Sequence, residues 1–132
     1  MRIGPYRLRV LVVDDDLNVA SVLSRLLRHL GCEVTTSTES PAALATFEAA
    51  PDDFDLLFTD QEMPELRGPE LIRRCRTIRP NLVVIIGSGM PLSEPLTECL
   101  FLRKPYHLQG LRDALDWARS QVDRAVDAPN KG

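Results

Sequence analysis

Five short runs of apolar or β-branched residues recur along this chain, separated by stretches in which apolar residues repeat at helical spacing. Strands that alternate with helices are typical of a parallel sheet covered by helices on both faces, with right-handed crossovers. We therefore predict an α/β fold with a doubly wound, five-stranded parallel sheet. The predicted strands are residues 7–13, 33–37, 56–58, 82–86 and 99–102, and helical spacing spans 19–30, 41–50, 68–79 and 107–122.

Length and composition indicate one globular domain. The chain has 132 residues, of which 44% are hydrophobic and 27% charged. We predict a single domain over 1–132, with a core of about 8–125, a short leader of residues 1–6 and a polar tail of residues 127–132.

Composition also limits where in the cell the protein is expected and which classes of partner it is expected to bind. No apolar run reaches the ~18 residues of a membrane span, and the N-terminus lacks a signal-peptide pattern, so we expect a cytoplasmic protein without a membrane partner. The net charge of −3 gives no electrostatic footprint for nucleic acid. The three cysteines lack metal-ligand spacing and are expected to be small buried residues in a reducing compartment.

Polar side chains stand where four of the predicted strands end. They are Asp14, Asp15 and Asp16 after the first strand, Asp60 after the third, Ser88 after the fourth and Lys104 after the fifth. Each has an ordinary explanation by itself: a helix cap, a turn residue or an exposed lysine. Open parallel sheets, however, bind ligands outside the carboxyl ends of their strands, so we expect these side chains to converge on one site.

Such a site suits phosphoryl transfer. Carboxylates without a nearby histidine or cysteine favour Mg²⁺, which keeps coordination positions open for a phosphate. An aspartate neutralised by the metal can attack phosphorus and form an acyl phosphate. Lys104 can offer a positive charge to the phosphoryl oxygens and Ser88 a hydroxyl hydrogen bond.

With these residues, the chain resembles a receiver domain of two-component response regulators over about residues 8–125. Asp60 lies in Asp-Gln-Glu-Met-Pro, which matches the Asp-x-x-Met-Pro signature of that family. The resemblance implies a flavodoxin-like sheet with strand order 2-1-3-4-5. It also implies a signalling switch, not an enzyme, in which a sensor histidine kinase or a histidine phosphotransfer protein passes a phosphoryl group from a phosphohistidine to Asp60.

The resemblance assigns a role to each site residue. Asp14, Asp15, Asp60 and the backbone carbonyl of Glu62 would bind Mg²⁺ or Mn²⁺; Asp16 would be a helix cap or acidic support; Ser88, Gly89 and Lys104 would bind the phosphoryl group; Ser88 and Phe101 would form the switch; and Pro105 would follow a cis peptide bond. The phosphorylated form would then bind a downstream protein of unknown identity, and the family pattern allows a homodimer.

One segment departs from the family pattern. Only fifteen residues lie between Ser88 and Lys104, and Pro91 and Pro95 interrupt them. A parallel crossover needs about a dozen residues, so we predict that the fourth helix is shortened or missing. The usual docking surface of the family is then altered. The short segment and the Ser-Gly pair resemble receivers attached to hybrid sensor kinases.

The predicted third helix carries a basic face. It consists of Arg67, Arg73, Arg74, Arg76 and Arg79. Such a face is expected to be solvated surface, or else to meet an acidic partner.

Three other functions compete with the signalling switch. A pseudo-receiver would bind partners without phosphate, although it would be expected to lack the acceptor or the lysine. A Mg²⁺-dependent aspartyl phosphatase of the haloacid dehalogenase type would need Asp-x-Asp-x-Thr/Val after the first strand, and residues 14–18 fit that pattern poorly. A flavodoxin-like cofactor binder is disfavoured because no Ser/Thr/Gly-rich phosphate loop follows the first strand.

Overall fold

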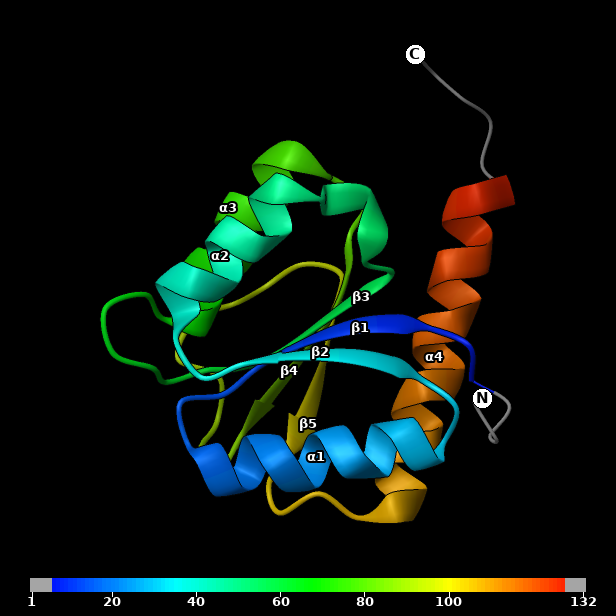
Figure 1. The fold of residues 1–132 in the computed structure, drawn as a ribbon, viewed down its shortest axis with the longest axis horizontal. Helices are drawn as coiled ribbons and strands as arrows, with labels where there is room; N and C mark the ends of the chain where they lie inside the picture. Colours follow the sequence, from blue (N-terminus) through cyan, green and yellow to red (C-terminus); the bar gives the residue numbers. More distant parts are fainter. Residues whose placement is uncertain (1–5, 128–132) are drawn as a thin grey trace.

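The computed structural model describes the backbone of residues 6–127 and the side chains of residues 6–124 (Figure 1). In chain order the elements are β1 (Arg9–Val13), α1 (Leu17–His29), β2 (Glu33–Ser37), α2 (Ser40–Ala49), the 3₁₀ helix η1 (Pro51–Asp53), β3 (Leu56–Asp60), α3 (Gly68–Ile78), β4 (Val83–Ser88), β5 (Cys99–Arg103) and α4 (Leu108–Asp127). All neighbouring strands are parallel, and their order in the sheet is β2-β1-β3-β4-β5. The predicted fold class and strand order are confirmed.

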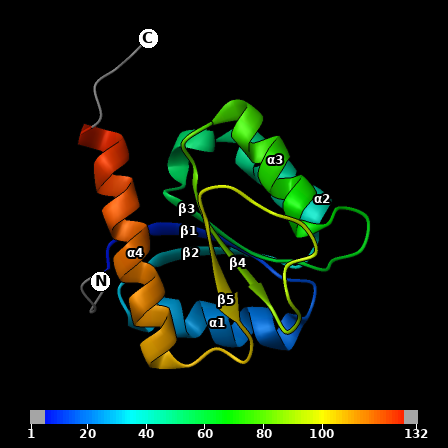
Figure 2. The same ribbon diagram turned by 180° about the vertical axis from the view of Figure 1, so that it is seen from behind.

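The sheet divides the core into two layers. Figures 1 and 2 show α1 and α4 on one face of the sheet, and α2 and α3 on the other. Val10 and Val12 of β1 pack in the first layer, while Leu11 and Val13 pack in the second. Alternate residues of a strand point to opposite faces, so a continuous apolar run supplies both layers at once.

Strand β4 continues two residues further than its apolar run predicts. Gly87 and Ser88 belong to the strand, with Gly87 in register with Asp60, and Ser88 in register with Arg103. A Cβ on Gly87 would lie 1.8 Å from the hydroxyl oxygen of Tyr106, whose ring packs edge-on against Phe58. The absence of a side chain at Gly87 therefore lets Tyr106 lie against the end of β4.

The crossover from β4 to β5 contains no helix. Residues 89–98 form bends and turns, which confirms that the fourth helix is missing. This segment, hereafter the β4–β5 loop, passes beside α3 (Figure 2). Arg73 forms an ion pair with Glu94, and Arg76 donates to the backbone carbonyl oxygens of Thr97 and Glu98 at 2.7 and 2.8 Å.

The basic face of α3 is therefore only partly solvated surface. Arg67 donates to the hydroxyl oxygen of Ser93 at 2.7 Å, and Arg79 donates to the carbonyl oxygens of Pro51 and Phe54. The expectation that this face is simply solvated is wrong for these arginines. The β4–β5 loop lies close enough to accept hydrogen bonds from Arg67 and Arg76, and residues 51–54 accept those of Arg79.

The structure describes only part of the predicted leader and of the predicted tail. Tyr6, the last residue of the predicted leader, is buried, and its hydroxyl donates to Asp116 at 2.5 Å. The rest of that leader (1–5) and residues 128–132 of the predicted tail lie outside the described residues. Within the described part, no helix has the length and apolar character needed to span a membrane.

The cysteines behave largely as small apolar residues. All three are free thiols; Cys32 and Cys75 are buried, and Cys99 is partly exposed. Burial raises the pKa of Cys75 to about 12, which makes its thiolate scarce at neutral pH.

Candidate functional site

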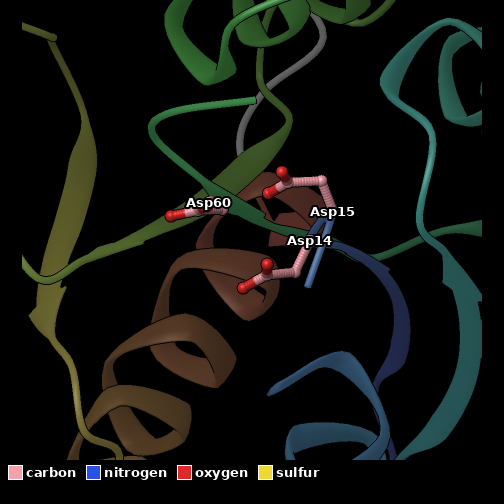
Figure 3. A group of neighbouring side chains, drawn as sticks. All are labelled: Asp14, Asp15 and Asp60. Carbon is pink, nitrogen blue, oxygen red and sulfur yellow. The ribbon is translucent and has the colours of Figure 1, made fainter. Parts of the chain in front are cut away.

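Three carboxylates gather where β1 and β3 end (Figure 3). Asp14, Asp15 and Asp60 each offer one oxygen, and these oxygens all lie within 4.8 Å of one another. Val13 is in register with Thr59, so the parallel pairing of β1 with β3 brings the residues that follow them together. Asp14 and Asp60 are buried, whereas Asp15 is exposed.

Lys104 follows the edge strand β5 and reaches this group along the same edge of the sheet. Its Nζ lies 2.8 Å from Oδ2 of Asp14 and 3.1 Å from Oδ1 of Asp60. Its backbone N–H donates to the carbonyl oxygen of Ser88 at 2.9 Å, which fixes the chain as it leaves β5. The Lys104–Pro105 peptide bond is cis, as the resemblance implies. The ammonium group of Lys104 contacts two of the three carboxylates, and the remaining excess of negative charge favours the binding of a cation.

The pKa shifts follow from this crowding. Burial raises the pKa of Asp60, the charge of Asp14 raises it further, and the hydrogen bond from Lys104 opposes both. Burial alone would lower the pKa of Lys104, but the hydrogen bonds to Asp14 and Asp60 outweigh it and leave this pKa raised. The site therefore favours the protonated ammonium form of Lys104 and disfavours the ionised form of Asp60.

Asp16 caps the first helix. Its Oδ1 accepts hydrogen bonds from the N–H groups of Asn18 at 2.9 Å and Val19 at 3.1 Å. Its own N–H donates to Oδ1 of Asp14 at 2.9 Å. Asp14 is thus held by Asp16 through one oxygen and by Lys104 through the other.

Sequence reasoning missed Gln61, which follows Asp60 and is only 1% exposed. Its Nε2 donates to Oγ of Ser88 at 3.0 Å and to the carbonyl oxygen of Pro91 at 3.1 Å. Its Oε1 accepts from the N–H of Ser93 at 2.7 Å. Gln61 thereby joins the end of β3 to the end of β4 and to the β4–β5 loop.

The remaining predicted residues lie around this centre. The exposed carboxylate of Glu62 is paired with Arg67 at 2.6 Å, so its side chain is already engaged. Gly89 follows β4 with open space where a Cβ would stand. Phe101 lies on β5 in register with Ile86, partly buried against the α2–α3 layer of the core.

The crowding at Asp60 makes a testable prediction about stability. Because its pKa is raised in the folded chain, its charge costs stability once the pH exceeds the unfolded value of about 3.8. In chelator at pH 7, Asp60→Asn should raise the free energy of unfolding by about 1 kcal/mol and Tm by about 3–5 °C. Thermal unfolding at several pH values measures this.

The sign and the control are both specific. The gain of Asp60→Asn should shrink as the pH falls toward 4, because the native carboxyl then becomes protonated at no cost. Asp15→Asn removes an equal charge from an exposed position and should change Tm much less. A gain for Asp60→Asn that does not depend on pH would contradict the electrostatic explanation.

Comparison with known proteins agrees with this geometry. The family model of the response regulator receiver domain matches residues 10–116. The response regulator receiver protein CpdR of Brucella abortus is 32% identical over 114 residues, which cover 82% of this chain and 93% of that protein. The receiver domain of the hybrid histidine kinase CckA superposes with a TM-score of 0.73 at 32% identity, covering 86% of this chain and 98% of that structure.

A plant relative is much longer than this chain. The two-component response regulator ORR24 of Oryza sativa subsp. indica is 31% identical over 134 residues, covering 97% of this chain but 21% of that protein. The present chain thus spans about a fifth of the length of this relative. The parallel sheet, the carboxylates with their lysine and the family match lead to one conclusion: the chain belongs to the response regulator receiver domain family.

Proposed function

We propose that this chain is a phosphorylation-dependent signalling switch whose phosphoacceptor is Asp60. The observation that carries the proposal is the position of the Lys104 ammonium, within hydrogen-bond distance of both Asp14 and Asp60. A positive charge fixed beside a buried carboxylate stabilises the charge that develops on a transferring phosphoryl group. The phosphoryl donor would be the phosphohistidine of a sensor histidine kinase or of a histidine phosphotransfer protein.

The transfer exchanges one bond for another. A carboxylate oxygen of Asp60 attacks phosphorus and forms the P–O bond of an acyl phosphate, while the P–N bond to the donor histidine breaks. The imidazole leaves with the electron pair of that bond and takes up a proton. Because a carboxylate needs no deprotonation to attack, this chain supplies position and charge and no general base.

A divalent metal fits the residues that surround Asp60. Asp14, Asp15 and Asp60 offer only carboxylate oxygens, and hard ions such as Mg²⁺ or Mn²⁺ prefer oxygen ligands. Glu62 would contribute its backbone carbonyl, since its side chain is paired with Arg67. When bound, such a metal would supply positive charge that offsets the negative charge of the phosphoryl oxygens.

Ser88 and Phe101 would convert the phosphoryl group into a signal. Ser88 would donate its hydroxyl to a phosphoryl oxygen, assisted by the adjacent Gly89 and by Lys104. It is in register with Arg103, two residues after Phe101 on β5, so a shift of Ser88 acts directly on that strand. The two arrangements of β5 would differ in their affinity for a downstream protein or for a second copy of this chain. Besides its own phosphorylation and dephosphorylation, the chain would catalyse no reaction.

The test is the intact mass of the chain after incubation with acetyl phosphate and Mg²⁺. The native chain should gain one phosphoryl group, whereas Asp60→Asn, or native chain treated with chelator beforehand, should gain none. Asp55→Asn is a matched control, because that carboxylate is bound to Arg9 rather than to the site, and it should still be labelled.

A short-lived acyl phosphate could escape detection by mass. Beryllofluoride, which forms a stable analogue of the phosphorylated aspartate, then provides the second measurement. Mg²⁺-dependent binding of beryllofluoride that Asp60→Asn abolishes would support the proposal. If neither labelling nor beryllofluoride binding occurs, the phosphate-independent pseudo-receiver becomes the better description.

A further inference from the structure

Both polar atoms of the Gln61 side chain form hydrogen bonds, and the side chain is almost completely buried. Its Nε2 donates to Ser88 and Pro91, and its Oε1 accepts from Ser93. An unsatisfied buried polar group costs free energy, so this amide is stable only while all three partners keep their places. The position of one partner is thus coupled to the positions of the other two.

Two backbone groups fix which way the amide faces. The carbonyl of Pro91 can only accept a hydrogen bond, and the N–H of Ser93 can only donate one. The NH₂ end of Gln61 must therefore face Pro91 and Ser88, since the reversed amide would oppose like groups at both backbone positions.

This orientation decides what the Ser88 hydroxyl can do. Oγ of Ser88 accepts from Nε2 of Gln61 at 3.0 Å and from the N–H of Met90 at 3.1 Å. A hydroxyl has two acceptor sites and one proton. With both acceptor sites occupied by groups that can only donate, the proton of Ser88 is left to donate, which is the form that a phosphoryl oxygen needs.

We propose that Gln61 is a positioning residue for phosphoryl recognition, which holds the Ser88 hydroxyl as a donor and ties that state to residues 91–93 of the β4–β5 loop. The inference rests on the proposed function, in which Ser88 binds the phosphoryl group on Asp60. The loop replaces the missing helix, and the Gln61 amide connects its residues Pro91 and Ser93 directly to Ser88. Phosphorylation should then move the loop as well as β5.

The test is a double-mutant cycle read as beryllofluoride affinity at saturating Mg²⁺, measured by isothermal titration. Gln61→Met keeps the length and burial of the side chain but donates nothing. It should weaken binding about 10-fold, the loss expected when a hydrogen-bond donor is no longer held in place. In the Ser88→Ala background the same change should alter affinity by less than about two-fold, because no hydroxyl remains to be oriented.

A matched variant separates orientation of Ser88 from attachment of the loop. Ser93→Ala removes the hydroxyl that accepts from Arg67 but keeps the backbone N–H that donates to Gln61, and it should leave affinity within about two-fold. Equal losses for Gln61→Met in the native and Ser88→Ala backgrounds, or a loss for Ser93→Ala equal to that for Gln61→Met, would overturn the inference and leave Gln61 as a structural residue.

A measurement on the native sequence avoids dependence on the folding of Gln61→Met. The backbone amide resonance of Ser93 should shift when beryllofluoride binds, and should shift much less in Ser88→Ala. No shift of Ser93 in a native chain that binds beryllofluoride would contradict the inference alone. Failure of the native chain to bind beryllofluoride would overturn the proposed function, and this inference with it.

Discussion

Lys104→Met is expected to slow the phosphorylation of Asp60 by acetyl phosphate about 100-fold, the effect typical of removing one group that stabilises transition-state charge. The Lys104 ammonium lies 2.8 Å from Asp14 and 3.1 Å from Asp60. Without this ammonium group, the carboxylates of Asp14 and Asp60 repel each other and also repel the acetyl phosphate anion. The measurement is the initial rate of labelling by intact mass at saturating Mg²⁺.

Arg103→Met is the control for the change of net charge. Arg103 is the neighbouring residue and carries the same charge, but its side chain is exposed and no contact with the carboxylates is observed. Its replacement should alter the labelling rate less than about three-fold, as expected of a screened surface charge. If Lys104→Met were labelled as fast as the native chain, the ammonium would have no part in the transfer.

Gly68→Ala should cause a large loss of stability. A Cβ on Gly68 would lie 2.2 Å from the backbone oxygen of Asp60 and 3.1 Å from Cα of Gln61, and neither atom can move without displacing the end of β3. The N–H of Gly68 also donates to the carbonyl of Gln61 at 2.9 Å, which holds the start of α3 against that strand. We expect a loss of about 2–3 kcal/mol and a fall in Tm of about 10 °C.

Gly89→Ala is the matched control, because no atom lies within 4 Å of the position of its Cβ. Thermal unfolding should show a change of less than about 0.5 kcal/mol. Gly68→Ala should also weaken beryllofluoride binding, since the displaced backbone carries Asp60. A Tm for Gly68→Ala within a degree of the native value would show that α3 can shift away from β3 at little cost.

The fold was predictable because its determinants are local. Continuous apolar runs, such as residues 56–58 at the start of β3, indicate strands buried on both faces, and the segments between the runs have helical periodicity. Once the strands are known to be parallel, their carboxyl ends share one edge. The closeness of Asp14, Asp60 and Lys104 then follows from topology, without any knowledge of side-chain conformation.

The role of Gln61 was not predictable, because it depends on hydrogen bonds to residues far along the chain. Its partners, Ser88, Pro91 and Ser93, lie 27 to 32 residues later. From the sequence it is one more polar residue after a strand, where solvent-exposed turns are common. No local pattern indicates that a loop covers it and buries its amide.

The path of the β4–β5 loop could not be predicted from the sequence for a related reason. Pro91 and Pro95 predict the absence of a helix, but they do not say where the chain goes instead. The helical period correctly placed Arg73 outside the buried face of α3. Whether that side meets water or a loop depends on tertiary packing, which periodicity does not report.

The contacts of Arg76 bear on how this protein can diverge. Its guanidinium binds the main-chain carbonyls of Leu82, Thr97 and Glu98, and every amino acid supplies that acceptor. Substitutions at 97 can therefore accumulate without loosening this attachment of the loop to α3, whereas position 98, at a φ of 54°, favours residues that tolerate the left-handed region. Where the loop is anchored through its backbone its exposed side chains are free to vary, so related chains could change the partners they recognise while keeping the same fold.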